Sequence, residues 1–239
     1  GNMTMEFKGQ LIIAGLNAKT TKGDGSEYVT AIQYMAPAET VDGLNVCPMA
    51  KLAGCEAACL YTAGRGQMNS VQAARIRKSE FWRDDRASFL DALRNDLRKF
   101  SNKCAKAGVQ PCVRLNGTSD IRWERTGIMD EFPGVQFYDY TKDVARVARK
   151  QPANYHLTLS YSEASPEYRL RLIAAMGQAP LANVAVVFRS ADVIPETFLG
   201  RRVVDGDKDD LRFLDPQGVV VALYAKGAAK KDTSGFVIG

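Results

Sequence analysis

Apolar and polar residues first alternate along residues 7–16 and again along residues 27–35. Alternation with a period of two is typical of half-buried strands. The polar, glycine-containing turn around Gly23 and Gly25 separates the two stretches. The pattern therefore predicts an N-terminal β-hairpin, followed by an irregular lead-in over residues 37–45.

Helical spacing replaces this alternation further along the chain. Residues 70–77 predict a helix with Ser70 as its N-terminal cap. Residues 87–107 predict the clearest helix, because apolar side chains recur at i, i+4 and i+7 and Gly108 provides a stop signal. Cys104 lies on this apolar stripe, so we expect it in the hydrophobic core.

From Pro111 onward, short apolar runs alternate with helical segments. This order is typical of βαβ units and a parallel sheet, so the sequence predicts an α/β fold. A partial (β/α) barrel and a doubly wound sheet both fit, and we favour the barrel-like form, with the cysteine loop lying across one end. The expected strands are residues 112–115, 135–140, 155–160, 184–188, 202–204 and 219–224, and the expected helices are residues 141–150 and 165–176.

Composition fits one soluble globular domain over residues 1–239, with 46% hydrophobic and 25% charged residues. We divide it into a hairpin and lead-in (3–45), a cysteine loop with helices (46–108) and βα units (109–239). No apolar run approaches the ~20 residues of a membrane span, so no membrane partner is expected. The N-terminus lacks a signal-peptide pattern, which predicts a reducing compartment where cysteines bind metal rather than form disulfides.

Three of the five cysteines, Cys47, Cys55 and Cys59, follow the spacing C-x7-C-x3-C. Thiolates are soft ligands that suit zinc, Cu(I) and iron–sulfur clusters. Structural zinc usually takes four ligands with cysteines in C-x2–4-C pairs, and here no C-x2-C occurs and His156 is distant. Three cysteines with one open position favour a [4Fe–4S] cluster. The alternative is that they are small buried apolar residues.

Polar and charged side chains directly follow four of the expected strands. Ligands of parallel α/β folds bind at the carboxyl ends of strands, although turns favour such residues in any case. Together they predict a polar pocket for a small-molecule ligand or substrate. The expected pocket residues are Arg65, Asn116, Ser119, Asp120, Tyr138, Lys142, Glu163 and Arg189.

Three further features have simpler explanations. The acidic run from Asp205 to Asp209 lacks the glycine and the final glutamate of a calcium loop, so we interpret it as a solvated turn. His156 lies between apolar residues of an expected strand, which favours a core position. Cys112 begins a strand and should lie away from the pocket, but it stays open as a fourth ligand.

Several blocks together resemble the phage "gene product 88" family. They are C-P-M-A-K-L-A-G-C-E-A-A-C-L-Y-T-A-G-R-G, V-R-L-N-G-T-S-D-I, F-Y-D-Y-T-K, N-Y-H-L-T-L-S and L-D-P-Q-G-V-V-V-A-L. The resemblance extends from about Asn45 to the C-terminus. It implies a phage-encoded protein that acts in the host cytoplasm, with Cys47, Cys55 and Cys59 as the metal ligands.

The cysteine block is also similar, more distantly, to the cluster loop of radical S-adenosylmethionine enzymes, which join a three-cysteine [4Fe–4S] cluster to a partial (β/α) barrel. The usual C-x3-C-x2-C spacing is absent here. This departure argues against binding of S-adenosylmethionine.

Three functions follow from these observations. The first is an iron–sulfur protein with a pocket at the barrel rim. Its cluster would have a redox, Lewis-acid or radical role, and the protein would be an enzyme if the pocket holds a substrate. The second is a zinc-stabilised nucleic-acid-binding module, since a net charge of +5 permits such a partner. The third is a protein that binds a host or phage protein and whose cysteines are structural. In the second, the phosphates would face Arg65, Arg75, Arg77 and Lys78.

Overall fold

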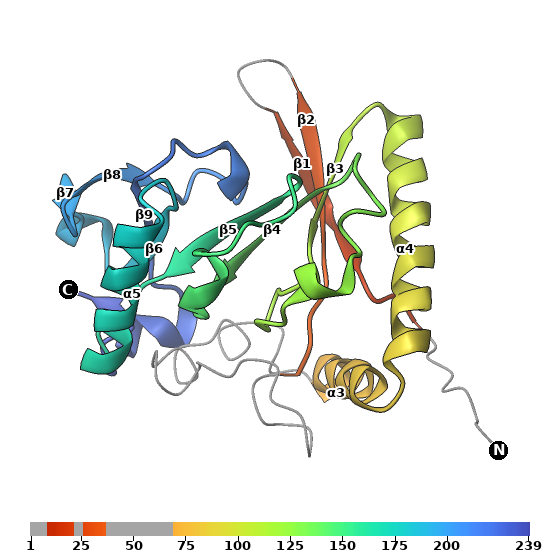
Figure 1. The fold of residues 1–239 in the computed structure, drawn as a ribbon, viewed down its shortest axis with the longest axis horizontal. Helices are drawn as coiled ribbons and strands as arrows, with labels where there is room; N and C mark the ends of the chain where they lie inside the picture. Colours follow the sequence, from red (N-terminus) through yellow and green to blue (C-terminus); the bar gives the residue numbers. More distant parts are fainter. Residues whose placement is uncertain (1–8, 22–25, 37–68) are drawn as a thin grey trace. The chain divides into compact units, whose positions relative to one another are not determined.

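The computed structural model describes residues 9–21, 26–36 and 69–239. They form a mixed α/β fold with a ten-stranded, largely parallel sheet and three α-helices (Figure 1). The strand order is β1-β2-β3-β4-β5-β6-β9-β8-β7, and β10 also pairs with β6. The described residues divide into two compact units: unit 1 comprises residues 9–21, 26–36, Ser70–Asp139 and Pro152–His156, and unit 2 comprises Asn69, Tyr140–Gln151 and Leu157–Gly239.

The parallel α/β character predicted from the alternating pattern is confirmed, but the barrel is not. Over the described residues the sheet is open, because the strand order begins with β1 and ends with β7. Each of these end strands pairs antiparallel with its neighbour, β1 with β2 and β7 with β8. Barrel closure would instead require the two end strands to pair with each other.

Unit 1 begins with the predicted hairpin, formed by β1 (Ile13–Thr21) and β2 (Glu27–Ile32). The hairpin is confirmed, although its first strand lies later in the chain than residues 7–16. The pairing register shifts between Ala14 and Lys19, so an irregularity interrupts the ladder.

Two consecutive helices of unit 1, α3 (Asn69–Asp84) and α4 (Arg86–Ala107), are separated by Asp85 alone. The Asp85 carboxylate caps α4 by accepting a hydrogen bond from the backbone N–H of Ser88 at 3.1 Å. Gly108 ends α4 with φ of 69°, the left-handed conformation that glycine adopts without strain. The apolar stripe of α4 faces inward beside β3, as predicted, and its buried residues are Phe89, Leu93, Leu97 and Cys104 (Figure 1).

The remaining strands of unit 1 run parallel to β2. β3 (Gln110–Arg114) pairs with β2, and β4 (Gln136–Thr141) pairs with β3. A short 3₁₀ helix, η3 (Trp123–Thr126), lies between β3 and β4 in the sequence. The side-chain amide of Asn154 donates hydrogen bonds to three backbone carbonyls before β4 and so holds the turn that leads into this strand; the carbonyls belong to Met129, Phe132 and Val135.

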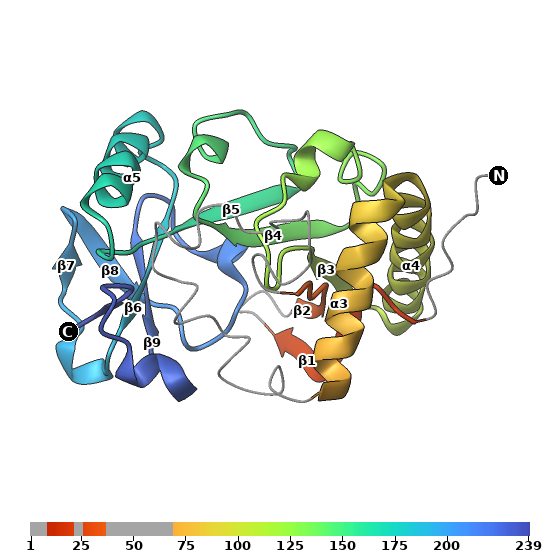
Figure 2. The same ribbon diagram turned by 90° about the horizontal axis from the view of Figure 1, so that it is seen from below.

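Unit 2 holds the second parallel set. β5 (Tyr155–Ser160) leads to α5 (Pro166–Gln178), which Ser165 caps, and then to β6 (Val184–Phe188). Figure 2 shows α5 on one side of the strands of this unit. The smaller elements are η5 (Ala191–Val193), β7 (Thr197–Phe198), β8 (Arg201–Asp205), η6 (Arg212–Leu214), β9 (Val220–Tyr224), η7 (Gly227–Lys231) and β10 (Val237–Ile238).

The helix predicted over residues 141–150 is wrong, because this segment forms only a 3₁₀ turn, η4 (Val144–Arg146). The Thr141 hydroxyl accepts a hydrogen bond from the backbone N–H of Asp143, a local turn that competes with helix formation. The Gln151 side chain donates to the carbonyl of Arg146 at 2.7 Å. In an α-helix that carbonyl would instead accept a backbone N–H from the next turn of the helix.

None of the helices in the described residues is long and apolar enough to cross a membrane.

Candidate functional site

The expected metal ligands Cys47, Cys55 and Cys59, together with Arg65, lie outside the described residues. Over residues 9–21, 26–36 and 69–239, no group of three or more His, Cys, Asp and Glu side chains is placed to hold a metal ion. Candidate metal chemistry in this chain therefore rests on the residue types and spacing of the cysteine stretch.

The two remaining cysteines have the environment of core residues. Cys112 is fully buried in β3, and burial together with the nearby Cys104 raises the pKa of its thiol to about 12. Burial also raises the pKa of Cys104, against the opposing charge of Lys103. Burial of both thiols is the environment expected of core cysteines.

The loop after β3 is built around Asn116, which is buried. Its side-chain oxygen accepts hydrogen bonds from the Ser119 hydroxyl at 2.7 Å, the Ile121 backbone N–H at 3.0 Å and the Trp123 indole N–H at 3.0 Å. Its side-chain NH₂ donates to the Ile121 carbonyl. The expected pocket residues Asn116 and Ser119 are thus engaged in shaping their own loop.

This loop lies directly against the end of β2. The backbone N–H of Gly117 donates to the Gln33 carbonyl at 3.0 Å, and the Thr118 hydroxyl donates to the Met35 carbonyl at 2.6 Å. A Cβ at position 117 would approach the Gln33 carbonyl oxygen to 2.8 Å, so only glycine fits there. The carboxyl ends of β2 and β3 therefore meet without a gap for a larger side chain.

A buried carboxylate, Asp139, connects this loop to β4 and β5. Its Oδ1 accepts the backbone N–H of Asn116 at 3.0 Å, and its Oδ2 accepts the Tyr155 hydroxyl at 2.7 Å. The guanidinium Nε of Arg114 lies 4.0 Å from Oδ1. The two donors replace hydrogen bonds that water would otherwise give to the carboxylate, and the guanidinium places a positive charge nearby. A carboxylate with such partners can stay ionised in the interior of a protein.

Tyr138, expected in the pocket, is also buried in unit 1. Its hydroxyl is 3.0 Å from the Thr30 hydroxyl, and the Arg114 guanidinium lies 5.9 Å from the centre of its ring. β4 continues through Thr141, so Tyr138 and Asp139 lie within the strand rather than after it. Unit 1 therefore contains four of the expected pocket residues: Asn116, Ser119 and Asp120 follow β3, whereas Tyr138 lies inside β4.

The other three expected pocket residues, Lys142, Glu163 and Arg189, belong to unit 2. Lys142 is half-buried directly after β4. The exposed Glu163 accepts a hydrogen bond from the buried Tyr161 hydroxyl at 2.7 Å, and Arg169 donates to the same hydroxyl at 3.0 Å. Burial, followed by the Glu163 contact, raises the pKa of Tyr161 to about 12.

Arg189 binds the chain itself. Its guanidinium donates to the backbone carbonyls of Lys230 at 2.7 Å, Asp232 at 2.8 Å and Gly239 at 2.5 Å. The backbone N–H of Arg189 also donates to the carbonyl of Ile238, the last residue of β10. The residues around β10 thus cover the carboxyl end of β6, where a ligand pocket was expected.

The acidic run 205–209 uses its carboxylates within the protein. Asp207 accepts the backbone N–H of Tyr224 at 2.6 Å and pairs with Lys226. Asp209 accepts the backbone N–H of Leu211 at 2.8 Å. His156 lies in β5, as predicted, but it is half-buried rather than in the core.

The basic residues assigned to phosphate contact do not form one exposed surface. Lys78 is only 4% exposed, and burial together with the charge of Arg75 lowers its pKa to about 8, while Asp96 opposes the shift. The Arg75 guanidinium lies over the ring of Tyr34, 4.6 Å from its centre. Arg77 is exposed.

Sequence reasoning did not select the Arg114–Asp139–Tyr155 group. A signal was available, because Arg114 and Asp139 are charged residues within strands that also contain apolar, inward-facing residues. Such residues are buried only when they are paired.

Two searches, one of curated proteins and one of solved structures, find no match to this chain. The comparisons therefore give no support to the similarity with radical S-adenosylmethionine enzymes. A family model described as gene product 88 matches residues 10–239, nearly the whole chain. The chain therefore belongs to the gene product 88 family.

Proposed function

We propose that this protein is an iron–sulfur protein of phage origin that acts in the host cytoplasm, with a [4Fe–4S] cluster held by Cys47, Cys55 and Cys59. The observation that carries the proposal is the separation of the five cysteines into two classes. Cys104 and Cys112 are buried, with thiol pKa values raised above the ordinary range. Three closely spaced cysteines remain for a soft metal centre.

The donor set fits a cluster with one open iron better than a closed zinc site. Zinc sites of the structural kind take four ligands, whereas the cysteine stretch offers three thiols and both Cys104 and Cys112 are buried in the core. When bound, such a cluster supplies an electron carrier or a Lewis-acidic iron.

The strand-end residues of unit 1 support a ligand pocket as a second part of the proposal. Asp139 and its partners fix the position of the Asn116 loop, so polar groups at these strand ends are held rigidly. Rigid polar groups are what orientation of a small ligand requires. The ligand pocket uses the half-buried positions of this loop, such as Thr118 and Arg122, rather than the Asn116 side-chain oxygen, which already accepts three hydrogen bonds.

Anaerobic purification followed by iron, acid-labile sulfide and zinc analysis tests the cluster. We expect about four irons and about four sulfides per chain, with a visible absorption band that dithionite bleaches. Serine substitution of Cys47, Cys55 or Cys59 should remove iron and sulfide together. Cys104→Ala is the matched control and should retain both.

Stoichiometric zinc without sulfide would contradict the cluster and favour the zinc-stabilised module. A chain that is folded and free of iron, sulfide and zinc after anaerobic handling would instead favour a structural role for all five cysteines.

A further inference from the structure

Charge is distributed unevenly along α4. In its first half, Arg94 pairs with Asp91 at 2.9 Å and with Glu131 at 2.9 Å, so cation and carboxylates neutralise one another. In its second half, residues 98–107 include no acidic residue. The basic residues of this half are all exposed, and we call them the α4 basic stripe: Arg98, Lys99, Lys103 and Lys106.

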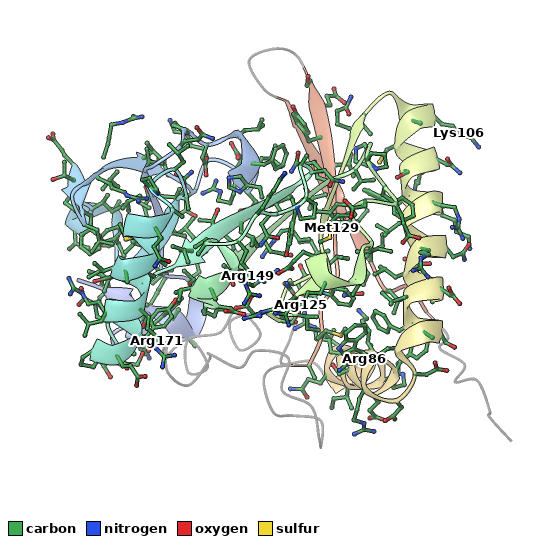
Figure 3. The ribbon with its side chains drawn as sticks, viewed as in Figure 1. Arg86, Lys106, Arg125, Met129, Arg149 and Arg171 are labelled. Atoms are coloured by element: carbon green, nitrogen blue, oxygen red, sulfur yellow. The ribbon has the colours of Figure 1, made fainter. Side chains whose placement is uncertain are left out.

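None of these four side chains pairs with a carboxylate within the part of the chain that the structure describes. The opposite side of the same helical turns is buried, with Leu97 and Cys104 in the core. Figure 3 shows the labelled Lys106 side chain extending outward from α4. The stripe therefore presents its full charge to solvent.

Helix geometry keeps the stripe compact. Lys99, Lys103 and Lys106 follow the spacing i, i+4, i+7 and share one side of the helix, with Arg98 beside them. At 1.5 Å per residue the four charges span about 12 Å along the axis. The carboxyl end of a helix carries only about half a negative charge, which one cation offsets. The helix dipole therefore does not explain the presence of four cations.

The residue types in and around the stripe indicate whether its partner is an acidic protein or a nucleic acid. Protein–protein interfaces have apolar, aromatic-rich centres and few lysines. No large hydrophobic residue of α4 is exposed, and the residues between the cations are small or polar, such as Asn102 and Ala105. Lysine and arginine without apolar anchors are typical of contacts to nucleic-acid phosphates.

We propose that the α4 basic stripe binds the phosphate backbone of nucleic acid without sequence specificity. This surface differs from the α3 residues Arg75, Arg77 and Lys78, and it does not depend on the nature of the metal centre. Four phosphate contacts to duplex DNA give a slope of log K against log[salt] of roughly −3.6, so binding should weaken steeply with salt.

Fluorescence anisotropy of the full-length chain with a labelled duplex of about 30 base pairs tests the proposal, at salt concentrations from about 50 to about 200 mM. The test variant is Arg98→Gln/Lys99→Gln/Lys103→Gln/Lys106→Gln. The control variant removes the same charge from exposed unit 2 positions: Arg149→Gln/Lys150→Gln/Lys208→Gln/Lys230→Gln. Circular dichroism melting shows whether each variant is folded.

We expect the stripe variant to bind at least about tenfold more weakly and to lose most of the salt dependence, while the control keeps both within about threefold. An equal loss in the two variants would show that net charge alone attracts DNA and would overturn the proposal. Absence of wild-type binding at about 50 mM salt would also overturn it. Tighter binding to poly-glutamate than to the duplex would assign the stripe to an acidic protein instead.

Discussion

The hydroxyl of Tyr155 donates a 2.7 Å hydrogen bond to the Oδ2 of Asp139, and both residues are buried. This contact joins the first residue of β5 to β4 within unit 1. The same carboxylate accepts the backbone N–H of Asn116 and lies near Arg114. A single buried carboxyl group thus ties two strands and a loop together.

Tyr155→Phe removes one donor from this carboxylate while preserving the ring. We expect the free energy of unfolding to fall by about 2 kcal/mol, because hydrogen bonds to charged groups contribute roughly 1.5–3 kcal/mol. Urea denaturation followed by circular dichroism measures the change. Tyr224→Phe is the control, since the half-exposed Tyr224 makes no hydroxyl hydrogen bond to the described residues. Equal stability of both variants would contradict the prediction.

Asn116→Ala should disorganise the loop after β3. It leaves the Ser119 hydroxyl, the Ile121 N–H and the Trp123 indole N–H without their acceptor. We expect a loss of ~3 kcal/mol in the free energy of unfolding, with a change in tryptophan fluorescence in the folded state. Thr118→Val is the comparison, because it removes a single loop hydrogen bond, that to Met35. A smaller effect for Asn116→Ala than for Thr118→Val would exclude Asn116 as the centre of the loop.

Lys78 makes stability depend on pH. Its pKa is lowered to about 8 in the folded chain from 10.5. Between these values the unfolded chain binds more protons, so stability rises as pH increases from about 8 to about 10.5, by up to roughly 1.4 kcal/mol per pH unit. Urea denaturation at several pH values measures this slope.

Lys78→Met should remove this rise in stability with pH. It should also increase the free energy of unfolding near pH 7, because folding of the variant buries no charged group at position 78. Lys99→Met, at an exposed position of α4, should leave the slope unchanged. If wild type and Lys78→Met showed the same pH dependence, the buried ammonium would not be its source.

Arg189→Lys should loosen the residues around β10. A lysine ammonium cannot reproduce the fork that reaches the carbonyls of Lys230, Asp232 and Gly239. We expect the backbone amide of Arg189, which donates to Ile238, to exchange about tenfold faster, as measured by hydrogen exchange with mass spectrometry. The Tyr161 amide, which donates to Ala185, serves as an internal reference. If the Arg189 amide exchanged at the same rate in the wild type and in the variant, Arg189 would not be holding this segment.

The sequence predicted those elements whose signals are local. β5 and β6 have the predicted bounds, the helix expected over residues 165–176 is α5, and Gly108 ends α4, because periodicity and stop signals depend on neighbouring residues. The helix predicted over residues 141–150 failed because a side chain, Gln151, takes the carbonyl that a helix would need. That contact spans only five residues, but it does not follow from the spacing of apolar side chains.

Sheet closure and the candidate site depend on tertiary pairing. A series of βα units is compatible with both a barrel and an open sheet. The open sheet ends in antiparallel pairs, and one of them uses β7, a strand of only two residues that gives no periodic pattern in the sequence. Lys78 appeared to belong to an exposed basic surface, yet α3 continues to Asp84 and buries Lys78 and Ser79. The predicted metal ligands Cys47, Cys55 and Cys59 lie outside the described residues and stay a prediction.

The edge of β6 has an uncommon division of partners. Its first residues, Val184 and Ala185, pair with β5, whereas Val187 and Phe188 pair with β10. Roughly fifty residues separate Phe188 from Val237, and a ribosome adding about 5–20 residues per second needs several seconds to make them. During that interval the nascent chain has half of this edge open, and open strand edges recruit other chains. Pairing of Val237 and Ile238 with β6 is therefore what closes this half of the edge to other chains.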